Sequence, residues 1–134
     1  MPSRENPHPR ILCIAPSFTN LGPILRAIKT SGYQIALAAT AIQAVAISVG
    51  NLVSAVVLDA DFIRNEDWSV AKSLKLVKPS LPILLLDPKD ISRNALPANI
   101  DAVSNHDSTD DILAKLKHLL DGGSVVPIKN SIGG

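Results

Sequence analysis

The sequence contains little sulfur, few aromatic rings and almost no net charge, and each shortage narrows the class of protein. A single cysteine, Cys13, excludes an internal disulfide, disfavours a metal site built on thiolates and fits a reducing cytosol. Thirteen basic and twelve acidic side chains leave a formal net charge of +1, so the overall charge indicates neither nucleic acid nor an anionic membrane as a partner. No apolar run is long enough to span a bilayer, and the first ten residues lack an apolar signal region. We therefore expect a cytoplasmic protein.

The length and the hydrophobic content predict one compact domain. A chain of 134 residues with 46% hydrophobic side chains can build a substantial core. Both ends are rich in proline, glycine, serine and asparagine without periodicity. This composition predicts flexible segments at 1–9 and 122–134 around a domain at 10–121.

The apolar residues of this domain alternate between two patterns. Continuous apolar runs are typical of strands buried on both faces, and repeats at helical spacing indicate helices with one apolar stripe. Strands that alternate with helices favour right-handed crossovers, and so predict a three-layer α/β fold with a mostly parallel sheet. The strand runs lie at 11–14, 35–38, 55–58 and 83–86, and the helical stripes are Leu21, Ile24, Leu25 and Ile28; Ile42, Val45, Ala46 and Val49; Val70, Leu74 and Val77; and Ile112, Leu116 and Leu119.

Polar residues and prolines predict some of the helix ends. Ser17, Thr19 or Asn20 is expected to cap the first helix, and Ser-Thr-Asp-Asp at 108–111 has the pattern of a capping box. Prolines bracket the segment 89–96, so the helix expected there is short or irregular.

From about Ile11 to Leu120 the chain resembles the receiver domain of bacterial response regulators, the CheY-like superfamily. The resemblance rests on the run 11–14, Ser-Gly-Tyr-Gln-Ile at 31–35, Ala-Val-Val-Leu-Asp at 55–59 and Leu-Pro before the run 83–86. It implies a flavodoxin-like sheet of five parallel strands in the order 2-1-3-4-5. It also implies that Asp59 occupies the position of the phosphoaccepting aspartate, at the carboxyl edge where chemistry collects in such sheets.

The resemblance further implies that most of the site chemistry has been replaced. Ala15 and Pro16 stand where the family has two acidic Mg²⁺ ligands, and neither carries a side-chain oxygen. Asp87 replaces a hydroxyl residue and His106 replaces a lysine. A carboxylate about 4 Å from a phosphoryl group would repel it by roughly 1–4 kcal/mol per charge pair. Magnesium binding is therefore not expected.

These substitutions favour a non-catalytic pseudo-receiver that needs no cofactor and binds proteins in a two-component network. The expected partners are a histidine kinase, another receiver or a second copy of the chain, through the fourth-helix region, the fifth strand and the fifth helix. Asp59 would then cap a loop or pair with His106, or share a proton with Asp87 and His106. Asp61 is expected to face solvent in the loop after Asp59.

Two other functions stay open. Asp59 could be phosphorylated in spite of the substitutions, as in a single-domain response regulator. The hydroxyl-rich segment 17–22 could instead hold the phosphate of a flavin or nucleotide, although the loop lacks the expected glycine and only 3% of the residues are aromatic.

Overall fold

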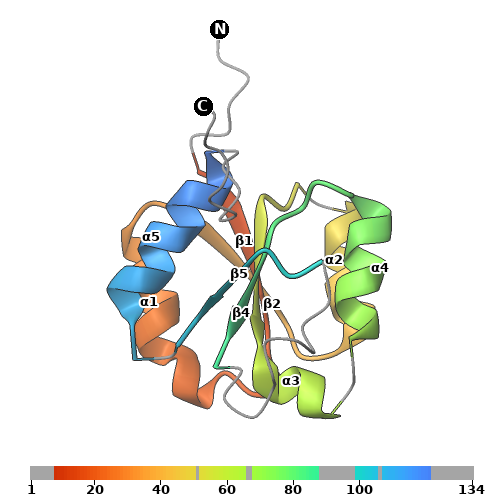
Figure 1. Cartoon of the computed structure of the whole chain (residues 1–134), viewed down its shortest axis with the longest axis horizontal. Coiled ribbons are helices and arrows are strands. Elements are labelled where there is room, and N and C mark those ends of the chain that lie inside the picture. The colour runs from red at the N-terminus through yellow and green to blue at the C-terminus, as the bar shows by residue number, and fades with distance from the viewer. Residues whose placement is uncertain (1–7, 51, 66–67, 88–98, 106, 122–134) are drawn as a thin grey trace, which may run out of the picture.

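The computed structural model describes residues 8–50, 52–65, 68–87, 99–105 and 107–121 as alternating strands and helices (Figure 1). The predicted helix between the last two strands lies outside these residues. The elements are β1 (Arg10–Ile14), η1 (Thr19–Leu21), α1 (Gly22–Thr30), β2 (Gln34–Ala38), α2 (Ala41–Gly50), β3 (Ala55–Asp59), α3 (Ala60–Asn65), α4 (Ser69–Val77), β4 (Ile83–Leu86), β5 (Ala102–Ser104) and α5 (Thr109–Leu120).

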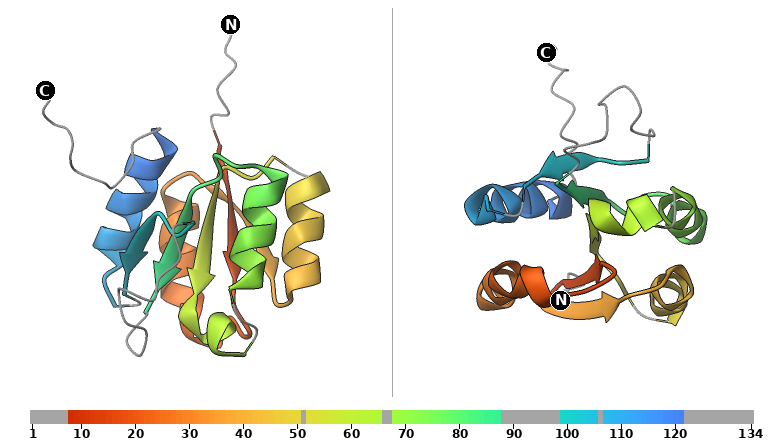
Figure 2. Two further views of the ribbon diagram at one scale, coloured as in Figure 1. Left: turned by 45° about the vertical axis from the view of Figure 1, so that its right-hand side comes forward. Right: turned by 90° about the horizontal axis from the view of Figure 1, so that it is seen from below.

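The five strands form one parallel sheet in the order β2-β1-β3-β4-β5. Helices α1 and α5 cover one face of the sheet, and α2 and α4 cover the other (Figure 2). The predicted three-layer α/β class and the flavodoxin-like strand order are therefore confirmed. None of the helices in the described ranges is long and apolar enough to cross a membrane.

The central strands are buried on both faces, which explains their continuous apolar runs. Along β3, Val56 and Leu58 face the α2/α4 layer, whereas Ala55 and Val57 face the α1/α5 layer. Cys13 lies in the core between the sheet and the α1/α5 layer, with 1% of its surface exposed, as expected. Burial raises the pKa of its thiol to about 12.

The prediction that the run 35–38 is buried on both faces was wrong. Only Ala38 of β2 is fully buried, and Leu37 is 46% exposed. The reason is position, because β2 is an edge strand that pairs with β1 alone. Leu37 is therefore left partly exposed, whereas Ile35 and Ala36 are half-buried against the two cores.

The predicted apolar stripe of α2 was also wrong. The helix buries Ala44 and packs Ala41 and Ile47 against the core, while Ile42 and Val49 point outward with 83% and 69% of their surface exposed. The sequence of α2 is apolar nearly all round, so periodicity does not determine the buried face. The small side chains of Ala41 and Ala44 let the helix approach its neighbours closely.

The predicted side-chain caps are not formed. Helix α1 begins after Leu21 with a proline in its first turn, and the Ser17 hydroxyl instead accepts a hydrogen bond from the Thr19 N–H at 3.3 Å. Helix α5 does begin after Ser108, but that side chain makes no capping hydrogen bond. Val77 differs from its prediction too, because it is 39% exposed at the end of α4 while Val70 and Leu74 are buried.

Candidate functional site

The candidate site lies where the strands end, at the edge of the sheet occupied by α3 in Figure 1. Ile14 is in register with Leu58, and Asp59 is in register with Leu86. Ala15, which follows β1, therefore lies level with Asp59. Asp87, which follows β4, lies one residue beyond that level. The topology brings these predicted site residues to one edge, as the sequence implied.

Asp59 begins a helix instead of a loop. It is a buried carboxylate with 5% of its surface exposed, and its Oδ1 accepts a hydrogen bond from the Asp61 N–H at 3.1 Å. This is the contact that an N-cap side chain makes with the second residue of a helix. The expected loop at Asp61 is therefore wrong, although Asp61 is exposed as predicted, in the first turn of α3.

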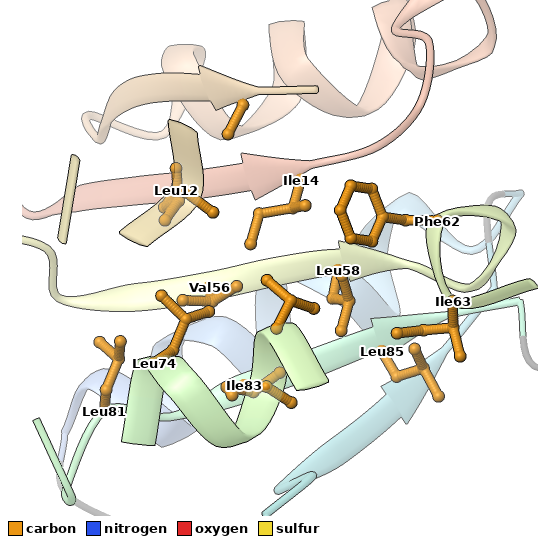
Figure 3. Packing of buried hydrophobic residues seen from close by; sticks show 14 of the residues in the cluster. Leu12, Ile14, Val56, Leu58, Phe62, Ile63, Leu74, Leu81, Ile83 and Leu85 are labelled. Carbon is orange, nitrogen blue, oxygen red and sulfur yellow. The ribbon is translucent and has the colours of Figure 1, made fainter. Parts of the chain in front are cut away.

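Helix α3 is anchored by the side chains that follow. Phe62 and Ile63 are buried in the same core cluster as Ile14, Leu58 and Leu85. Figure 3 shows Phe62 beside Ile14 and Ile63 beside Leu85, at the ends of their strands. The packing of these two side chains explains why the chain turns into a helix immediately after Asp59.

Ala15 and Pro16, which the resemblance places at the positions of two acidic ligands, supply no side-chain ligand. Ala15 is fully buried, and its N–H donates to the Ala38 carbonyl at 3.2 Å. Pro16 is exposed, and its ring has no donor or acceptor atom. A magnesium ion needs several oxygen ligands in octahedral geometry. The side chains at these two positions therefore do not fit the ion that receiver domains hold here. Within the described ranges, no three or more His, Cys, Asp or Glu side chains are grouped to hold a metal.

Asp87 has an unusual backbone conformation. Its φ angle is +54°, and it is the only non-glycine residue with a positive φ in the part of the chain that the structure describes. Its N–H donates to the Ser104 carbonyl at 2.8 Å, so the β4–β5 pairing continues through this residue. Aspartate tolerates the left-handed region better than a β-branched residue does. The backbone at this position therefore disfavours a β-branched residue such as threonine.

A polar cluster beside β5 was not predicted. The Ser104 side chain is 3% exposed and its hydroxyl donates to Asp111 Oδ2 at 2.6 Å, while Lys115 Nζ lies 3.0 Å from the same oxygen. Lys115 also donates to the Val103 carbonyl. The hydrogen bonds from Ser104 and Lys115 lower the pKa of Asp111 below its usual value. The spacing of Asp111 and Lys115, four residues apart in a helix, was the available sequence signal.

His106 lies outside the described residues, so its pairing with Asp59 and the shared proton with Asp87 stay predictions. Its neighbour Asn105 is exposed after the end of β5. The structure thus brings Ala15, Asp59 and Asp87 to one edge, and adds Ser104 as a buried hydroxyl at the end of the fifth strand.

Many solved structures that resemble this chain are receiver domains. A CheY-like response regulator receiver domain protein from Methanospirillum hungatei is 21% identical with a TM-score of 0.74, over 86% of this chain and 95% of that one. The signal receiver domain of an HD domain-containing protein from Pseudomonas fluorescens is 18% identical with a TM-score of 0.75, over 90% of this chain and 92% of that one. The response regulator protein TrrA from Thermotoga maritima, solved in complex with Mg²⁺ and BeF, is 21% identical with a TM-score of 0.73, over 83% of this chain and 98% of that one.

These likenesses establish the fold. The protein has the CheY-like receiver fold, over nearly the whole length of the compared domains. No protein-family model matches the chain, and no curated protein matches it by sequence.

Proposed function

We propose that this protein is a pseudo-receiver, a signalling module of a bacterial two-component network that binds proteins without magnesium-dependent phosphorylation. Its partners would be a histidine kinase, another receiver or a second copy of the chain. We also propose that the protein is cytoplasmic and acts by binding and not as an enzyme. The receiver fold supports a role in a two-component network. The residues at the carboxyl edge support the absence of magnesium-dependent phosphorylation.

The observation that carries the proposal is the pair at the end of β1. Ala15 is fully buried beside Asp59, where a receiver needs a carboxylate for the cation. Formation of an acyl phosphate concentrates negative charge on Asp59, and this charge needs a cation or other positive groups nearby. Ala15 and Pro16 supply neither, and Asp87 adds a further carboxyl group to the same edge.

The contacts of Asp59 give a second reason for its presence. Its Oδ1 is hydrogen-bonded to the Asp61 N–H, which stabilises the start of α3 by about 1 kcal/mol if it acts as an ordinary N-cap. An aspartate at this position therefore has a structural role that does not require phosphorylation.

The test is exposure of the purified chain to acetyl phosphate and Mg²⁺, followed by the intact mass. We expect the unmodified mass in the wild type and in Asp59→Asn, and a phosphoryl adduct on TrrA from Thermotoga maritima as the positive control. Binding of Mg²⁺ with beryllofluoride, measured by calorimetry, should likewise be found only for TrrA. An adduct on the wild type that is absent from Asp59→Asn would establish the phosphorylatable alternative and overturn the proposal.

The retained carboxylate at Asp59 is the one observation that favours the phosphorylatable alternative. For the flavin alternative, the relevant measurement is the visible absorbance of the protein as purified. We expect a colourless protein, because Ser17 and Thr19 are hydrogen-bonded to each other at 3.0 Å in an exposed turn. A flavin spectrum would show that the module carries a cofactor and would contradict the proposal.

A further inference from the structure

Helix α2 has an outward face that is apolar and free of charge. Ile42 and Val49 are 83% and 69% exposed, and Ala46 between them is exposed as well. The whole helix, Ala41–Gly50, contains no charged residue. Large exposed apolar side chains that cluster on a charge-free surface are typical of interaction sites. Helix α2 also lies at the side of the molecule next to the edge strand β2 (Figure 2), so a partner can reach it.

A hollow of about 320 Å³ lies where α2 ends. It is lined by apolar side chains from α2, from the following segment and from the end of α4, with one lysine. The Ser48 hydroxyl is buried at this hollow and has no hydrogen-bond partner within the described part of the chain. The lining residues are Ser48, Val49, Leu52, Val53, Val77, Lys78 and Leu81.

The exposed stripe of α2 runs from Ile42 near the start of the helix to Val49 at the hollow. These two residues are about 10 Å apart along the axis, and the midpoint between them lies between Val45 and Ala46. A twofold axis through this midpoint would place Ile42 against the partner's Val49, next to the partner's hollow. The same axis places the partner's Ile42 against Val49, as an isologous interface requires.

We propose that two copies of this chain associate through antiparallel α2 helices, with Ile42 of each copy entering the hollow at the end of the other copy's α2. A second copy fits this face because α2 itself carries no charge, so two copies of the helix meet without like-charge repulsion. The one lysine of the hollow, Lys78, donates to the Val53 carbonyl at 3.4 Å. Ile42 and the hollow also lie at opposite ends of the same helix, so a twofold axis brings Ile42 of each copy to the hollow of the other. The small side chain of Ala46 at the centre lets the two helices approach closely. This inference concerns a different face from the fifth helix and does not depend on the state of Asp59.

The first test is sedimentation of the full chain over a concentration series up to roughly 100 µM. We expect a wild-type dimer, and at least about a hundredfold weaker association in Ile42→Lys, because the apolar contact of Ile42 with the hollow is lost twice in a symmetric interface. The matched control is Ala114→Lys, which places the same charge on the exposed face of α5. This control should dimerise like the wild type.

Two outcomes of this test would overturn the proposal. One is a wild-type chain that stays monomeric throughout the series. The other is a dimer that Ala114→Lys dissociates and Ile42→Lys does not, which would place the interface on α5. Both positions are exposed, so the thermal melting of each variant should match that of the wild type and should exclude misfolding as the cause.

The second test is a covalent link across the twofold. Ala46→Cys should form an intermolecular disulfide in mild oxidant, because residue 46 of each copy lies close to the axis. Cys13 does not compete, since it is buried and its pKa is raised to about 12. Addition of Ile42→Lys should abolish the link, and Ala114→Cys should not form one. Equal cross-linking at positions 46 and 114 would contradict the assigned interface.

Discussion

The interior of β3 and the residue that ends it obey different requirements. Residues 55–58 fill two cores and need only apolar volume, whereas Asp59 would need specific oxygen atoms from other strands to do chemistry. Many apolar residues satisfy the first requirement, and few residue types satisfy the second. The comparison explains how a receiver fold remains intact while the residues at its carboxyl edge change.

The largest effect is expected from the strand interior. Leu58→Ala should lower the free energy of unfolding by about 2–5 kcal/mol, because Leu58 is fully buried and its truncation leaves a cavity. Urea denaturation measures this loss. The matched control is Asp59→Asn, one residue further along the strand, which keeps a capping oxygen and should cost less than about 1 kcal/mol. Equal losses of unfolding free energy in the two variants would contradict the difference between the strand interior and its last residue.

A smaller effect is expected where β4 ends. Asp87→Thr, which introduces a hydroxyl, should destabilise the fold by about 1–2 kcal/mol, because a β-branched residue is strained at a φ of +54°. Asp87→Asn has the same shape and tolerates that conformation, so it should stay within about 0.5 kcal/mol of the wild type. Thermal unfolding of the two variants side by side tests this. A threonine variant as stable as the asparagine variant would count against strain.

A further prediction concerns the hydrogen bond by which Asp59 caps helix α3. Asp59→Ala should cost about 1 kcal/mol more than Asp59→Asn, because only alanine removes the acceptor of the Asp61 N–H. Hydrogen exchange at the Asp61 amide should be faster in the alanine variant and nearly unchanged in the asparagine variant. Equal exchange rates in both variants would show that the carboxylate does not cap α3.

The smallest effect is expected beside β5 and depends on pH. Ser104→Ala should lower stability at neutral pH by about 0.5–1 kcal/mol, because it removes the hydrogen bond to Asp111. This bond lowers the folded pKa of Asp111, so its stabilisation is present above the usual carboxyl pKa and is lost as the pH falls through the lowered value.

Urea unfolding from neutral to strongly acidic pH should therefore show a difference between the wild type and Ser104→Ala that disappears in acid. A carboxyl titration by nuclear magnetic resonance should show that the pKa of Asp111 rises in the variant. If the difference in stability between the wild type and Ser104→Ala were constant across the pH range, the effect of the substitution would come from packing alone and not from the hydrogen bond to Asp111.

The fold was predictable because burial on both faces leaves a strong trace in the sequence. The runs at 11–14, 55–58 and 83–86 all became strands of the sheet interior. The same reasoning did not apply to the run 35–38, because an apolar run does not show whether its strand lies at the edge. It also did not predict the buried face of α2, because apolar residues surround the helix and their spacing does not show which of them face the core.

The sequence predicted which candidate residues share one edge of the sheet, but not the contacts that they make there. Topology alone brings Ala15, Asp59 and Asp87 to one edge. The cap at the start of α3 depends on where Phe62 packs, and the bond between Ser104 and Asp111 depends on the orientation of α5. Such contacts come from tertiary packing, which local spacing does not encode.

The left-handed backbone at Asp87 also limits which side chains the end of β4 accepts. Threonine would bring a hydroxyl to this position, but on a backbone conformation that disfavours β-branched residues. Asparagine and glycine adopt this conformation more readily, so only a few residue types can replace Asp87 without a change of backbone. The geometry of one residue therefore restricts the chemistry that this edge of the sheet can carry.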